Sequence, residues 1–107
     1  MYIAMNRFQI AHGQEGAFET IWRERDSHLE TVPGFVEFHL LKGPKHDDYT
    51  LYASHTIWAS EQHFTDWTRS EAFRAAHKNA GQNKGVYIGH PVFEGFDAVP
   101  DIKVTAS

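Results

Sequence analysis

The chain has no cysteine among its 107 residues. Disulfide bonds, thiolate metal sites and cysteine nucleophiles are therefore excluded. It also lacks an apolar run as long as a membrane span, so we expect no membrane partner. The N-terminus shows no basic segment followed by a long apolar one, which is the pattern of a secretory signal. The sequence therefore predicts a cytoplasmic location.

The chain also has fewer positively than negatively charged residues. Ten Lys and Arg stand against fourteen Asp and Glu, a formal net charge of −4. A weakly acidic chain does not suit a broad nucleic-acid surface, and we expect no nucleic-acid partner. The glycine-rich motifs that bind dinucleotides and phosphates are absent, and so is the G-x-S-x-G motif of serine hydrolases. These absences leave nucleotide cofactors and serine hydrolysis without support.

Histidine, by contrast, is abundant, with eight residues. The closest pair in the sequence, His39 and His46, is seven residues apart. Local metal sites usually use spacings of two to five residues. The sequence therefore predicts no local metal site, and most of the histidines are expected on the surface.

Alternating apolar and polar residues predict four strands. The alternation is clearest at the N-terminus, where Asn6 shares a face with Phe8 and Ile10. In the second strand it places Val36, Phe38 and Leu40 on one face. The predicted strands cover residues 2–10, 35–41 and 49–58 and part of residues 86–98, where Pro91 and Gly95 interrupt the pattern. Residues 43–48 are predicted to form the loop of a hairpin.

A period near 3.6 predicts two helical regions. The first runs from residue 14 to about residue 30, and Arg25 interrupts its apolar stripe. The second follows Ser60, a suitable N-cap residue.

The second helical region is predicted to be broken. At about 100° per residue, Phe64 and Phe73 lie on opposite sides of one straight helix. A break near Arg69, with Ser70 capping a second segment, brings both apolar stripes to one side.

The resulting β-α-β-β-α-β order predicts a ferredoxin-like α+β domain, an antiparallel sheet with both helical regions on one face. We expect this domain to cover residues 1–99 and to be followed by a C-terminal tail, residues 100–107. The other face of the sheet also carries apolar residues and has no third layer to cover it. A homodimer joined through the sheets is therefore expected.

Three residues are candidates for chemistry. His77 shares an apolar stripe with Phe73 and Ala80. It is either a core histidine bonded to the backbone or a neutral imidazole at the edge of a pocket, which is what a haem iron needs as proximal ligand. Asn6 must find a hydrogen-bond partner or point into a cavity. Trp67 is either part of the core or part of a site.

Two stretches resemble the IsdG-type haem-degrading monooxygenases, within the superfamily of antibiotic-biosynthesis-monooxygenase-like dimeric α+β barrels. Residues 5–8 (MNRF) resemble the first-strand motif, and residues 64–78 (FTDWTRSEAFRAAHK) resemble the helical haem-binding segment. The resemblance implies a homodimeric barrel that binds haem as both cofactor and substrate. It implies an enzyme that opens the porphyrin oxidatively and releases the iron. Such an enzyme uses O2 and an external reductase or small-molecule reductant.

The resemblance also assigns roles to three residues, and a fourth is a candidate for haem binding. His77 resembles the proximal, axial ligand of the haem iron. Asn6 resembles the amide donor on the distal side, and Trp67 resembles the bulky side chain that distorts the porphyrin from planarity. Phe73 lies in the same segment and is expected to contact the haem.

Two other functions stay open. A cofactor-independent monooxygenase of the antibiotic-biosynthesis type, acting on aromatic polyketide-like substrates, would have the same element order. A haem-binding or regulatory dimer without enzymatic activity would share both the fold and the site, since fold alone does not decide function. The position of His77 on an apolar stripe favours haem.

Overall fold

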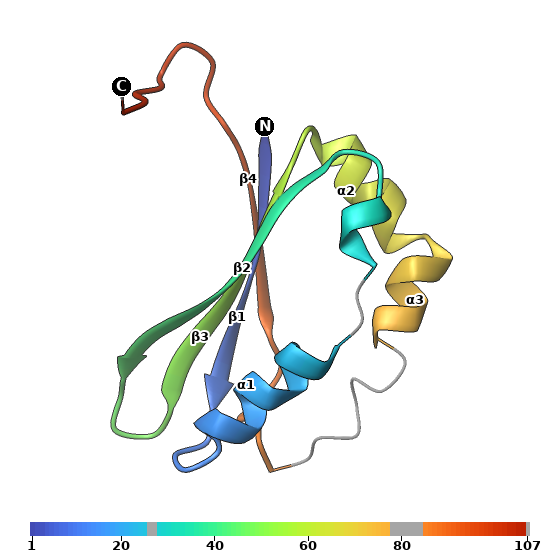
Figure 1. Ribbon diagram of the computed structural model, residues 1–107. Coiled ribbons are helices and arrows are strands. Elements are labelled where there is room, and N and C mark those ends of the chain that lie inside the picture. The colour runs from blue at the N-terminus through green and yellow to red at the C-terminus, as the bar shows by residue number, and fades with distance from the viewer. Residues whose placement is uncertain (26–27, 78–84, 107) are drawn as a thin grey trace.

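A four-stranded antiparallel sheet carries all the described helices on one of its faces in this computed structural model (Figure 1). The structure describes residues 1–25, 28–77 and 85–106, apart from the side chains of Ala76 and His77. The strands are β1 (Tyr2–Ile10), β2 (Phe35–Lys45), β3 (Thr50–Trp58) and β4 (Val92–Asp97), in the sheet order β2-β3-β1-β4. The helices are α1 (Glu15–Glu24), α2 (Glu61–Thr68) and α3 (Glu71–His77), with a short 3-10 helix η1 (Leu29–Thr31). The predicted ferredoxin-like α+β fold is confirmed.

Strand β1 lies inside the sheet, and its alternation separates the two faces as predicted. Every second residue points toward the helices, and four of these side chains are buried. Tyr2 and Ala4 belong to one apolar cluster, whereas Phe8 and Ile10 belong to another. Asn6 lies between them on the same face, so the core is divided at this residue.

The predicted break in the second helical region is confirmed. Helix α2 starts after Ser60, whose side chain accepts a hydrogen bond from the backbone N–H of His63, and ends before Arg69. The Ser70 hydroxyl then accepts a bond from the N–H of Phe73 at 3.2 Å and donates to the carbonyl of Trp67 at 2.6 Å. One serine therefore closes α2 and opens α3.

The first helix is shorter than predicted. It ends at Glu24, and Arg25 already has an extended backbone. Leu29 lies on the predicted apolar stripe and is buried, but it belongs to η1 rather than to α1. The spacing of apolar residues could not distinguish α1 followed by η1 from one long helix. A continuous helix would also have buried Leu29 on its apolar stripe.

Strand β2 departs from the predicted alternation. The register shifts between Phe35 and Glu37, so one extra residue is inserted. Val36 is consequently 59% exposed, whereas Phe35 and Phe38 pack on the core cluster near Trp58. A bulge of this kind moves the residues before it to the opposite face. The predicted grouping of Val36 with Phe38 and Leu40 is therefore wrong.

The hairpin after β2 and the last strand also differ in their limits. Strand β2 continues through Pro44 to Lys45, which an edge strand tolerates, and the hairpin closes with a bond from His46 N to Tyr49 O at 2.7 Å. Strand β4 is not interrupted at Gly95. The missing side chain of this glycine makes room for the Tyr2 hydroxyl, since a Cβ there would overlap it.

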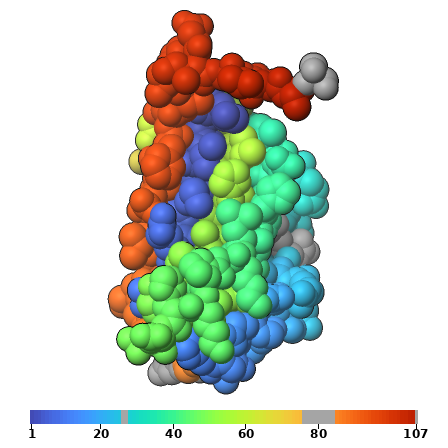
Figure 2. All heavy atoms as spheres, turned by 90° about the vertical axis from the view of Figure 1, so that its left-hand side faces the viewer, coloured from blue at the N-terminus to red at the C-terminus, as the bar shows by residue number. Residues whose placement is uncertain are grey.

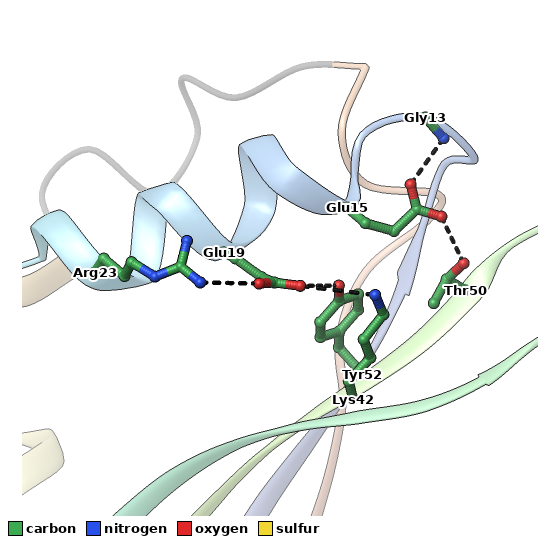
Figure 3. Close-up of polar contacts among 7 residues, drawn as sticks. All are labelled: Gly13, Glu15, Glu19, Arg23, Lys42, Thr50 and Tyr52. Atoms are coloured by element: carbon green, nitrogen blue, oxygen red, sulfur yellow. Dashed lines mark hydrogen bonds and ion pairs between the residues drawn. The ribbon is translucent and has the colours of Figure 1, made fainter.

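Helix α1 is fastened to the sheet by two carboxylates (Figure 3). Glu15 accepts a bond from the Thr50 hydroxyl at 2.7 Å, and Glu19 accepts one from the Tyr52 hydroxyl at 2.6 Å. Arg23 donates to Glu19 at 3.0 Å. These bonds lower the pKa of both glutamates, and burial together with Glu19 raises the pKa of Tyr52.

On the opposite face of the sheet, the described part of the chain places no helix. Figure 2 looks onto this face, where β4, β1, β3 and β2 lie side by side. Leu41, Val92 and Phe96 are each more than two fifths exposed there, beside the ion pair between Arg7 and Glu94. Within the described ranges, no helix is long and apolar enough to span a membrane.

Candidate functional site

A cavity of about 390 Å³ lies between the inner face of the sheet and the helices. Asn6, which divides the core on β1, lines this cavity, and strands of the sheet form its floor. Such a volume is within the usual range for small-molecule sites. The described lining consists of Ala4, Asn6, Phe8, Trp22, Arg25, Leu29, Phe38, Ser54, Thr56, Phe64, Trp67, Thr68, Phe73, Pro91 and Phe93.

The floor carries a polar strip. Asn6 lies directly opposite Ser54 in the β1–β3 ladder, and Thr56 is two residues further along β3. All three side chains line the cavity, and Ser54 and Thr56 are buried. A ligand seated on this floor meets hydrogen-bonding groups in the middle of an otherwise apolar surface.

The wall opposite the floor is aromatic. Trp67 in the last turn of α2 meets Phe73 of α3 edge to face, with ring centroids 4.8 Å apart. Phe64 stacks on Phe93 of β4 at 5.5 Å, with only 8° between the ring planes. The break between α2 and α3 brings Trp67 and Phe73 together, so this part of the wall depends on Ser70. Flat rings of this kind suit a flat ligand.

Helix α1 and the residue after it close the third side. Trp22 stacks on Phe38 at 5.5 Å, and the Arg25 guanidinium lies 4.2 Å from the centroid of the Trp22 ring. Burial lowers the pKa of Arg25, and the nearby Tyr87 hydroxyl opposes this shift. Arg25 is the charged residue of the described lining. The cavity is therefore suited to an aromatic ligand that carries a negative group.

The structure brings three of the four predicted site residues to one cavity: Asn6, Trp67 and Phe73. His77 is the last residue of α3. The direction of its side chain lies outside the described residues, as does Ala80 of the same predicted stripe. Among the described side chains, no group of three His, Cys, Asp or Glu residues could hold a metal ion.

Sequence reasoning missed two features of the cavity. Arg25 interrupts the apolar stripe of the first helical region, and a charge inside such a stripe is itself a signal of a lined pocket. Ser54 and Thr56 fall at inward positions of a strand in which every second residue is buried. Polar residues at two successive inward positions are a second signal.

Comparisons with known proteins place the chain among oxygenases. The family model described as "Antibiotic biosynthesis monooxygenase" matches residues 1–79. The curated "Heme oxygenase (staphylobilin-producing) 1" of Staphylococcus aureus is 34% identical over 79 residues, which are 73% of this chain and 72% of that protein.

Two solved structures share the fold. The heme-degrader MhuD from Mycobacterium tuberculosis, determined with two hemes in its active site, is 26% identical with a TM-score of 0.71, over 96% of this chain and all of that one. SnoaB, a cofactor-independent oxygenase from Streptomyces nogalater, is 21% identical with a TM-score of 0.66, over 94% of this chain and 95% of that one.

Proposed function

The chain belongs to the antibiotic biosynthesis monooxygenase family and, within it, to the IsdG-type branch, and from this premise we propose that it binds haem in the cavity and opens the ring oxidatively. The observation that carries the proposal is the cavity itself. It joins Asn6, Trp67 and Phe73, which come from three separate elements, and this placement supports the roles that the sequence resemblance implies for them. The relationship to a staphylobilin-producing haem oxygenase and to MhuD supports an oxidoreductase that takes haem.

The described residues fit haem as a ligand. The aromatic wall provides flat contacts for a porphyrin, and the volume suits insertion of part of the ring between wall and floor. Arg25 would form ion pairs with carboxylate groups of the ligand, a favourable interaction at a half-buried position.

The proposal gives one role each to His77, Asn6 and Trp67. His77 would hold the iron through a ring nitrogen. Asn6 would donate a hydrogen bond from its side-chain amide to the bound group. Trp67, held edge to face by Phe73, would contact the flat ring and shape the space that it occupies.

Haem, when bound, supplies the iron that activates O2 and the ring that is oxidised, and the electrons come from an external reductase or small-molecule reductant. The chain therefore supplies ligation, a hydrogen bond, shape and exclusion of water.

Titration of the purified protein with haemin tests binding. A ligated Soret spectrum is expected for the parent and for His90→Ala, because His90 is exposed and lines a separate hollow. His77→Ala should lose this spectrum, since the ring nitrogen that would hold the iron is removed. If His77→Ala binds and degrades haem like the parent, the haem proposal in this form is wrong.

Turnover is tested by adding ascorbate to the haem complex under air. Loss of the Soret band with release of iron indicates an enzyme. A stable Soret band indicates a haem-binding protein without this activity.

A cofactor-independent oxygenase is the second candidate. The polar floor and aromatic wall also fit a polycyclic phenol, and the fold is shared with SnoaB. Oxidation of such a phenol by the metal-free protein, together with failure to bind haemin, would favour this function.

A further inference from the structure

Ser54 lies across from Asn6 on the floor of the cavity. The two residues are direct partners in the β1–β3 ladder, and both line the cavity. Side chains of directly opposed residues have Cβ atoms about 5 Å apart. They can therefore contact the same atom of a third group. Ser54 is only 5% exposed, so its hydroxyl meets the cavity rather than bulk solvent.

The Ser54 hydroxyl differs from other hydroxyls near it. Thr50, on the same strand and face, donates to Glu15 at 2.7 Å. Thr68, on the cavity wall, donates to the carbonyl of Thr65 at 2.7 Å. In the described part of the chain, the side chains of Ser54 and Asn6 engage no hydrogen-bond partner. Both side chains line the cavity, so their polar groups are available to a water molecule or a ligand there.

We infer that Asn6 and Ser54 together form a hydrogen-bonding subsite for one oxygen atom of a flat aromatic ligand. A serine hydroxyl and a carboxamide each donate and accept, so the pair can take either a hydroxyl or a carbonyl oxygen. Thr56 faces Ala4 across the ladder and lacks such a polar partner. Trp67 and Phe73 hold the ring above the floor. The inference rests on the cavity being the ligand site, as proposed above, but not on the ligand being haem.

Phenol and toluene test this subsite on the metal-free, full-length protein, because they differ only in a hydroxyl and a methyl group. NMR titration gives the affinity of the protein for each compound. The affinity for phenol divided by that for toluene removes the contribution of the aromatic ring, which the two compounds share. In Ser54→Ala, the ratio should fall by about two- to tenfold in favour of toluene, the effect of one hydrogen bond. Ser54→Thr, which keeps the hydroxyl, should retain the ratio of the parent.

Thr68→Val is the matched control, because its hydroxyl already has an acceptor, and its ratio should equal that of the parent. An affinity ratio in Ser54→Ala equal to that of the parent overturns the inference. It is also overturned if the ratio falls equally in Thr68→Val, or if the parent binds neither compound. Haemin titration of the same proteins separates the two proposals. A parent that shows the Ser54 effect but binds no haemin supports the subsite and contradicts haem as the ligand. A parent that binds haemin but shows no Ser54 effect contradicts the subsite alone.

Discussion

Asn6 is accessible from the cavity because it interrupts an apolar row. Tyr2 and Ala4 on one side of it, and Phe8 and Ile10 on the other, pack into separate clusters. A fifth apolar side chain at this point would join the clusters and reduce the space between them. The carboxamide therefore keeps the floor open and gives it a polar group.

The first prediction concerns Asn6→Ala. If haem is the ligand, as proposed, it should still bind, because His77 would supply most of the anchoring, but degradation should slow sharply. Loss of one preorganised donor raises a barrier by on the order of 3 kcal/mol in other enzymes, which is about a hundredfold in rate. The rate of Soret bleaching with ascorbate measures this effect, and a rate equal to that of the parent would remove Asn6 from the mechanism.

A second prediction at the residue scale concerns Gly95→Ala. The added Cβ would collide with the Tyr2 hydroxyl, whose ring is packed in the core. Overpacking of this kind costs about 1–3 kcal/mol of unfolding free energy, as measured by urea denaturation. Gly16→Ala in α1 is the control, because a Cβ at Gly16 would meet no atom within 4 Å and should be neutral or stabilising. Equal effects of the two substitutions would contradict the packing of Tyr2 against β4.

At the scale of elements, α1 is joined to the sheet by two charged side chains, Glu15 and Glu19. The Tyr52 hydroxyl, followed by Arg23 and Lys42, lowers the pKa of Glu19, and the Thr50 hydroxyl does most to lower that of Glu15. A carboxylate with a lowered pKa in the folded state stabilises the fold above its ordinary pKa. This contribution is lost as the pH falls through the lowered value.

We therefore expect the unfolding free energy to fall as the pH drops from about 5 to about 3. In Glu19→Gln the fall should be smaller, because one of the two titrating carboxylates is absent. Urea denaturation at several pH values measures this. Glu24→Gln, an exposed position on the same helix, serves as the control and should keep the pH dependence of the parent. An identical pH dependence in Glu19→Gln and the parent would show that this contact does not stabilise the fold.

Two helical elements differ in how well the sequence predicted them. The break at Arg69 was predictable because the phases of Phe64 and Phe73 conflict within one helix. The end of α1 was not, because Arg25 and Leu29 continue its period. There, Leu29 of η1 packs into the cluster formed by Tyr2 and Trp58 of the sheet, and such a contact between distant segments is not visible in the period of the helix.

At the scale of the whole molecule, the uncovered sheet face predicts a homodimer. Phe96, Val92 and Leu41 expose apolar surface there, and Arg7 is neutralised by Glu94. Two copies can therefore meet on this face without repulsion between like charges. Sedimentation equilibrium at micromolar concentration should give twice the 12.3 kDa mass of the chain. Phe96→Lys should shift the equilibrium toward the monomer, and a parent that is only monomeric would contradict the prediction.

Patterns along the chain predict the strand and helix order, the ferredoxin-like topology and the helix break, and a local resemblance singles out Asn6, Trp67 and Phe73. These follow from periodicity, capping and a local motif, which are properties of neighbouring residues. The three-dimensional structure was needed to find the bulge at Val36 in β2, the place of Arg25 in the cavity lining and the position of Ser54 opposite Asn6. Each of these depends on strand register or on packing between distant segments, and neither is encoded in the spacing of residues along the chain.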